Sequence, residues 1–151
     1  MKILVPTDGS EFSRTAVQQA CEIAMDQTAA EIKILSVYEP HQPMGTEPFA
    51  VSAEFHAELD KIAKANAESW AKDAADLATS SVNGSEVNVS SSVERGDPAP
   101  LIIDTASSWG ADLIVMGSHG RGFWSRLTLG SVSDAVLHHA PCSVLIAKKD
   151  E

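Results

Sequence analysis

The sequence predicts an α/β protein with a single doubly wound parallel sheet and helices on both faces of that sheet. Two observations support this prediction. Short apolar runs typical of buried strands alternate along the whole chain with longer segments of helical periodicity. No repeat or linker interrupts the alternation, and 151 residues suit one domain. We therefore expect a single domain over residues 1–151, although this pattern alone does not determine the order of the strands.

The first half of the chain predicts two strands and two helices. Residues 3–5 (ILV) and 32–38 (IKILSVY) are apolar runs of the kind that form buried parallel strands. Between them, Ser10 is placed to cap a helix that ends near Gln27. A long helix is expected over about residues 50–78, where apolar positions recur every three or four residues and indicate one buried face. That face consists of Phe55, Leu59, Ile62, Asn66, Trp70, Ala74 and Leu77.

The second half predicts three strands and two helices. Residues 86–94 (EVNVSSSVE) alternate between apolar and polar side chains, as a half-exposed strand does. An Asp-Pro pair and a glycine mark the two ends of a helix over residues 98–109. Residues 112–116 (DLIVM) form the most apolar strand. A short helix over residues 130–139 and a last strand over residues 142–147 (CSVLIA) complete the chain.

Charge and composition exclude several classes of partner. The chain has 11 Lys+Arg against 21 Asp+Glu and a net charge of -10, which disfavours nucleic acid and anionic membranes. No apolar run reaches the length of a membrane span, and the residues after Met1 do not form a signal peptide. Cys21 and Cys142 are expected to be small buried thiols in a reducing compartment. We therefore expect a cytoplasmic protein without membrane insertion.

Two segments follow predicted strands at the edge where doubly wound sheets bind ligands. The first is residues 6–10 (PTDGS). The second is residues 117–133, which contain no acidic residue but contain His119, Arg121 and Arg126. Glycines in this second segment let backbone N–H groups approach an anion, and the following helix adds its own unpaired N–H groups. The second segment therefore predicts a site for phosphate.

These segments lack the common catalytic and nucleotide motifs. No Gly-Lys-Ser/Thr is present, the third glycine of a dinucleotide fingerprint is missing, and there is no G-x-S-x-G, H-E-x-x-H or paired C-x-x-C. The sequence therefore assigns no catalytic residue and no metal ligand. Asp8 could instead cap a turn, Arg121 and Arg126 could be solvated, and His119 could make a structural hydrogen bond.

The spacing Gly117-x2-Gly120-x9-Gly130-Ser131 comes directly after the most apolar strand and ends at a helix. Together with the segments ILVPTDGS, ILSVYEP, ERGDPAP, ADLIVMGSHGRG, LGSVS and APCSVLIA, it resembles the ATP-binding branch of the universal stress protein family over the whole chain. The resemblance implies a five-stranded sheet in the order 3-2-1-4-5, in which strands one and four end side by side.

The resemblance also implies roles for individual residues. Asp8 would bind the nucleoside, through the ribose hydroxyls or the adenine edge. Pro6, Thr7 and Val37 would line the adenine slot, and Met116 and Gly117 would lie beneath the ribose and phosphates. The phosphate chain would be held by Gly120, Gly130, Ser131, Val132 and Ser133, with Ser118, His119, Arg121 and Gly122 in the same loop.

Three functions follow as hypotheses. The first is a stress-response or regulatory protein that binds ATP, or AMP or ADP, with Mg²⁺ and thereby changes a surface that a protein partner contacts. It would form a homodimer through the apolar edge strand that begins at Cys142 and ends at Ala147. The second is slow ATP hydrolysis or autophosphorylation, for which no general base or arginine finger is evident. The third is a scaffold without nucleotide, which the intact glycine spacing disfavours.

Overall fold

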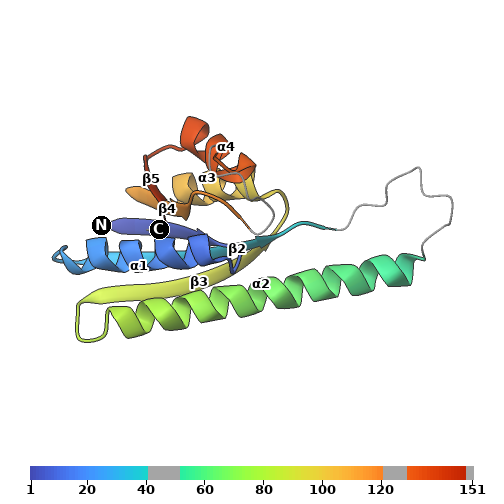
Figure 1. The fold of residues 1–151 in the computed structure, drawn as a ribbon, viewed down its shortest axis with the longest axis horizontal. Helices are drawn as coiled ribbons and strands as arrows, with labels where there is room; N and C mark the ends of the chain where they lie inside the picture. Colours follow the sequence, from blue (N-terminus) through green and yellow to red (C-terminus); the bar gives the residue numbers. More distant parts are fainter. Residues whose placement is uncertain (41–51, 121–128, 149–151) are drawn as a thin grey trace.

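The computed structural model describes residues 1–40, 52–120 and 129–148. These residues form a five-stranded parallel sheet in the order β3-β2-β1-β4-β5, which confirms the expected fold class and strand order (Figure 1). In chain order the elements are β1 (Lys2–Thr7), α1 (Glu11–Met25), β2 (Ala30–Tyr38), α2 (Ala53–Ser81), β3 (Val87–Arg95), α3 (Pro98–Trp109), β4 (Leu113–Gly117), α4 (Ser131–His139) and β5 (Ser143–Ala147).

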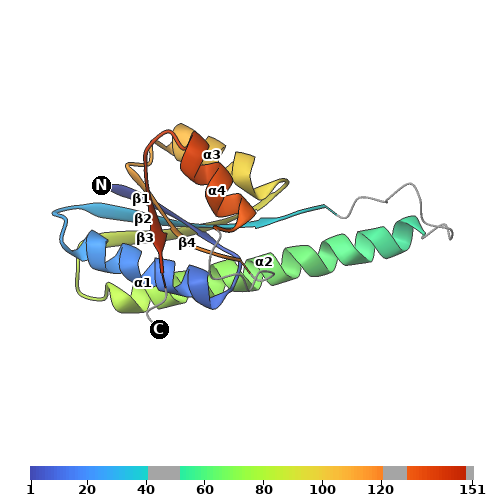
Figure 2. The ribbon, with the colours of Figure 1, turned by 45° about the horizontal axis from the view of Figure 1, so that its top comes forward.

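The helices cover the sheet in two layers. Helices α1 and α2 lie on one face, and α3 and α4 lie on the other (Figures 1 and 2). Because successive strand residues point to opposite faces, Ile3 and Val5 are buried under α1 and α2, while Leu4 is buried under α3 and α4. All three side chains are fully buried, and β1 is consequently apolar on both faces. This double burial explains why the central strands lack the alternation of a half-exposed sheet.

Strands β1 and β4 separate at their carboxyl ends. β1 pairs with β2 over its whole length, from Lys2 to Thr7, whereas its register with β4 comprises Ile3 and Leu4. Pro6 has no backbone N–H and cannot donate a ladder hydrogen bond. The separation leaves space at the point where the chain reverses its direction of winding, and doubly wound sheets bind ligands at this point.

The predicted buried face of the long helix is wrong over the first half of that helix. Phe55 and Ile62 are 53% and 51% exposed, because α2 continues well past the edge of the sheet (Figure 1). The buried positions are instead four alanines in the second half, which allow the helix backbone to approach the sheet closely. They are Ala67, Ala71, Ala74 and Ala78. Helical periodicity therefore identified the helix but not the extent of the surface against which it packs.

Both cysteines have free thiols, and their environments differ. Cys21 is buried in the cluster between the sheet and α1, and burial raises the pKa of its thiol to about 11. Cys142 is partly exposed beside β5, and partial burial followed by the charge of Asp112 raises the pKa of its thiol as well. A thiol reagent is therefore expected to reach Cys142 first in the folded protein.

Burial of Cys21 predicts a dependence of stability on pH. The unfolded thiol loses its proton near its ordinary pKa of 9.0, whereas the folded thiol keeps it until about pH 11. The folded state therefore binds more protons in this interval, and the free energy of unfolding should fall as pH rises from 8 to 10. The contribution of this thiol is about 1 kcal/mol. Urea unfolding at both pH values should show a smaller fall for Cys21→Ala than for the wild type, and equal falls would contradict the prediction.

None of the helices within residues 1–40, 52–120 and 129–148 is both long and apolar enough to cross a bilayer.

Candidate functional site

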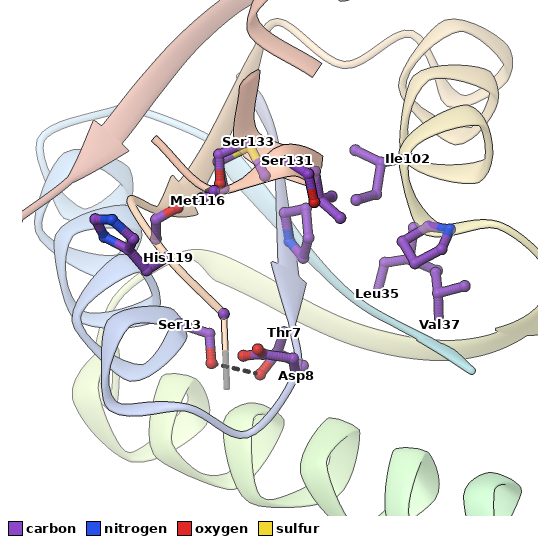
Figure 3. A pocket seen from close by; sticks show the side chains of 16 residues that line it. Thr7, Asp8, Ser13, Leu35, Val37, Ile102, Met116, His119, Ser131 and Ser133 are labelled. Atoms are coloured by element: carbon purple, nitrogen blue, oxygen red, sulfur yellow. Dashed lines mark hydrogen bonds between the residues drawn. The ribbon is translucent and has the colours of Figure 1, made fainter. Parts of the chain in front are cut away.

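A cavity of about 350 Å³ lies at the carboxyl ends of β1 and β4 (Figure 3). The two segments singled out in the sequence meet here, one from the end of β1 and the other from the end of β4. The lining residues are Pro6, Thr7, Asp8, Ser13, Leu35, Val37, Pro98, Ile102, Met116, Gly117, His119, Gly120, Gly130, Ser131, Val132 and Ser133.

The sequence-predicted residues largely coincide with this lining. Every predicted residue that the structure describes lines the cavity, apart from Ser118. Ser118 is buried and links elements: its N–H donates to the carbonyl of Ala147, and its Oγ lies 3.0 Å from Nδ1 of His119. Arg121 and Gly122 lie outside the described residues.

One wall of the cavity was predicted only at Val37. Leu35 and Ile102 line it together with Val37, and Pro98 adds the first turn of α3. Figure 3 shows Leu35, Val37 and Ile102 together on one side of the cavity, with His119 on the opposite side. The sequence signal that could have predicted the α3 part of this wall was the Asp97-Pro98 pair. It starts α3 directly after the carboxyl end of β3. This wall is apolar and suits a flat, weakly polar group.

The N-terminus of α4 forms another part of the cavity wall. Gly130 is its N-cap, and no described side chain accepts from the first N–H groups of this helix. Helices α1 and α2 differ in this respect, since Ser10 and Ser52 each cap them through a side-chain oxygen. Backbone N–H groups without an intrahelical acceptor, together with the positive end of the helix dipole, favour an anion at this place.

The hydroxyl of Ser133 has a structural partner. Its Oγ donates to the carbonyl oxygen of Gly117 at 2.8 Å, and Ser133 is 4% exposed. This bond ties the first turn of α4 to the end of β4. Any contribution of Ser133 to an anion would therefore come from its backbone N–H, whereas Ser131 is exposed at the start of the helix.

Asp8 joins the two segments. One carboxylate oxygen accepts from the N–H of Ser10 at 3.0 Å, which is the turn-capping role that the sequence left open. The other oxygen faces the glycine loop, which is the segment between β4 and α4 (residues 118–130), because a Cβ added at Gly120 would lie 2.9 Å from it. Next to Asp8 in the chain, the hydroxyl of Thr7 donates to Oγ of Ser13 at 3.1 Å (Figure 3). The carboxylate is thus held at the cavity wall.

Two further contacts shape the loop after β4. Gly117 packs directly on α1: a Cβ added there would lie 2.7 Å from Cβ of Phe12 and 2.8 Å from its carbonyl carbon. The ring of Phe12 then packs against the ring of His119, with their centroids 5.4 Å apart. The absence of a side chain at Gly117 therefore allows β4 to run close to α1 and brings His119 to the cavity.

The donor set for a metal ion is sparse. Within the described ranges, no cluster of three His, Cys, Asp or Glu residues could hold a metal ion. Asp8 supplies the one carboxylate among the described residues that line the cavity. Mg²⁺ keeps several waters and is commonly bound through one carboxylate and substrate phosphates. The cavity therefore fits a Mg²⁺ ion carried by a phosphate chain better than an ion held by the protein alone.

These features define a doubly wound α/β protein with a cavity at the carboxyl ends of its central strands, where an apolar wall and the anion-favouring N-terminus of α4 meet. The sequence model of the universal stress protein family matches residues 1–148, and the chain therefore belongs to this family. A universal stress protein of Synechocystis is 30% identical, with 97% of each chain covered.

Solved structures agree with this assignment. The universal stress protein UspA from Lactobacillus plantarum has a TM-score of 0.81 at 28% identity, with 98% of this chain and 97% of that chain covered. A family protein from Arabidopsis thaliana, whose structure has AMP bound, has a TM-score of 0.66 at 18% identity, with 99% and 92% covered. The second likeness concerns the fold alone.

Proposed function

We propose that this protein binds an adenine nucleotide, such as ATP, ADP or AMP, at the cavity between β1 and β4. The observation that carries the proposal is the N-terminus of α4, where Gly130 leaves the first N–H groups without a side-chain cap from the described residues, inside a cavity. Because this chain belongs to the same family, the AMP bound in the Arabidopsis family protein supports the proposal. The chain as a whole has a net charge of -10 and repels polyanions, whereas this helix end favours negative charge at one place. The site therefore suits a small anion rather than a polyanion.

Each part of the nucleotide has a matching part of the cavity. The base would pack against the apolar wall of Leu35, Val37 and Ile102, and the carboxylate of Asp8 would accept from ribose hydroxyls. The phosphates would lie between the glycine loop and the first turn of α4, at Gly130 and Ser131. Mg²⁺, when bound, would neutralise charge on the phosphate chain.

The nucleotide can be identified directly. Denaturing the purified protein and analysing the released small molecules by mass spectrometry should yield an adenine nucleotide. Titration calorimetry on the emptied protein should then show saturable binding of AMP, ADP or ATP, with GTP as the control for the base. A protein that neither retains nor binds any of these nucleotides would contradict the proposal.

We further propose a homodimer formed through β5. This strand is one edge of the sheet, and Val144, Leu145 and Ile146 are only partly buried there. An apolar edge strand of this kind is commonly covered by pairing with another chain. Light scattering after gel filtration at micromolar concentration should give twice the chain mass of 16.0 kDa, and a monomer would contradict the proposal.

The proposed role is that of a cytoplasmic regulator, in which bound nucleotide changes the surface offered to a protein partner. Slow ATP hydrolysis is the alternative that a turnover assay separates. Tight binding of ATP without phosphate release agrees with a regulatory role. Sustained phosphate release by the purified protein, lost in a variant that no longer binds ATP, would favour an enzyme instead.

A further inference from the structure

Trp70 of α2 contacts the loop that carries Asp8. The indole lies over Gly9, so that a Cβ added to Gly9 would be 2.3 Å from Cδ1, 2.6 Å from Cγ and 2.7 Å from Nε1 of Trp70. A real Cβ does not tolerate such distances. Gly9 has a φ of 74°, which side chains other than that of glycine rarely adopt. Gly9 therefore allows both the turn and the close approach of the indole.

The position of Trp70 along α2 is also informative. It lies between Ala67 and Ala71, the first two buried positions of the helix, and the half of α2 before them carries the exposed Phe55 and Ile62. Trp70 is thus at the place where α2 meets the sheet. A second cavity, of about 360 Å³, is lined by Trp70 together with Gly9 and residues of α1.

The contact continues from Gly9 to the proposed nucleotide site. Gly9 directly follows Asp8, and the N–H of Gly9 lies 3.3 Å from Oγ1 of Thr7. The Asp8 carboxylate accepts from Ser10 and is directed at Gly120. The three atoms nearest to a Cβ at Gly9 all belong to the indole. Loss of the indole would therefore leave the turn free to shift the carboxylate.

We propose that Trp70 is a positioning residue for Asp8: its indole holds the turn at Gly9, so that the carboxylate faces the glycine loop and the ribose of a bound nucleotide. The expected effect of Trp70 on nucleotide affinity rests on the proposed function. The geometry of the turn, however, can be measured without any nucleotide.

Three variants separate positioning from general packing. Trp70→Ala removes the indole, and Trp70→Phe keeps an aromatic ring over Gly9. Leu77→Ala is the matched control, because Leu77 lines the same second cavity from the same helix, about two turns further along α2. Amide hydrogen exchange of Ser10, measured by NMR without nucleotide, reports on the turn, since its N–H donates to Asp8. Calorimetry with AMP reports on binding.

Exchange of the Ser10 amide should be about tenfold faster in Trp70→Ala than in the wild type, and AMP should bind about tenfold more weakly, as for residues coupled through one contact network. Trp70→Phe should stay within about threefold of the wild type in both measurements. Leu77→Ala should lower the melting temperature but leave both values near those of the wild type.

The outcomes distinguish the two proposals. If Ser10 exchange in Trp70→Ala is no faster than in Leu77→Ala, Trp70 does not position the turn and the inference is overturned, whatever AMP does. If exchange responds as expected but the wild type binds no adenine nucleotide, the contact stands and the proposed function fails. If exchange responds but AMP affinity is unchanged in Trp70→Ala, the turn does not control the site and the inference is again overturned.

Discussion

Replacing Asp8 by alanine should weaken the binding of AMP by about one to two orders of magnitude, because a hydrogen bond to a charged group is worth about 1.5–3 kcal/mol. Asp8 supplies the one carboxylate among the described residues of the cavity, and its oxygen faces the glycine loop. The substitution also removes the acceptor for the Ser10 N–H. Calorimetric titration with AMP measures the loss.

The variant Asp8→Asn separates these two effects. Its amide oxygen can still accept from Ser10 and keep the turn, but the charge that strengthens a bond to a ribose hydroxyl is gone. Affinity in Asp8→Asn should therefore be reduced, though by less than in Asp8→Ala. Asp26→Ala serves as a control, since Asp26 is the exposed C-cap of α1, at the other end of the helix from Asp8, and does not line the cavity. If Asp8→Ala binds AMP with wild-type affinity, Asp8 does not contact the nucleotide and the prediction is wrong.

Gly117→Ala should destabilise the fold by roughly 1–3 kcal/mol, the usual cost of inserting a methyl group into a packed region. The added Cβ would lie 2.7 Å from Cβ of Phe12 and 2.8 Å from its backbone carbonyl carbon. A backbone atom inside helix α1 cannot rotate away as the end of a side chain can. We expect the melting temperature to fall by several degrees and AMP affinity to fall as well, because β4 and α1 must separate at the cavity.

Gly130→Ala is the matched control for this effect on stability. Gly130 adopts a φ of -64°, which any residue accepts, and a Cβ added there would meet its nearest atoms at 3.4 Å. Its melting temperature should therefore stay close to that of the wild type. Thermal unfolding followed by circular dichroism compares the two variants. Equal melting temperatures for Gly117→Ala and the wild type would show that α1 yields at Phe12, contrary to this prediction.

Much of the candidate site could be predicted because its signals are local in sequence. Glycine spacing after a very apolar strand predicts a loop whose N–H groups can approach an anion, and Gly130-Ser131 predicts the start of the following helix. The structure brings the residues of both segments, including Asp8, Met116 and Gly130, to one cavity. The prediction missed the apolar wall of Leu35 and Ile102, because side chains on separate elements meet there only after the sheet has formed.

Ser118 and Ser133 show a second limit. The family resemblance implied that both contact the nucleotide, Ser118 from the loop and Ser133 from the start of the following helix. In the structure Ser118 lies outside the cavity lining, and Ser133 Oγ bonds to the carbonyl of Gly117. A hydroxyl serves equally well as a ligand donor or as a link between elements, and the choice depends on which acceptor is within about 3 Å after folding.

The sequence by itself determined the alternation of strands and helices, the parallel doubly wound class and the two segments at the switch point, since apolar periodicity and glycine spacing act over a few residues. Tertiary structure alone decided how far α2 packs, because its alanines at 67, 71, 74 and 78 are buried while Phe55 is exposed. It also placed Trp70 over Gly9. Periodicity states which face of a helix is apolar. Whether a surface exists to cover that face depends on the length of the sheet beside it, which no local pattern records.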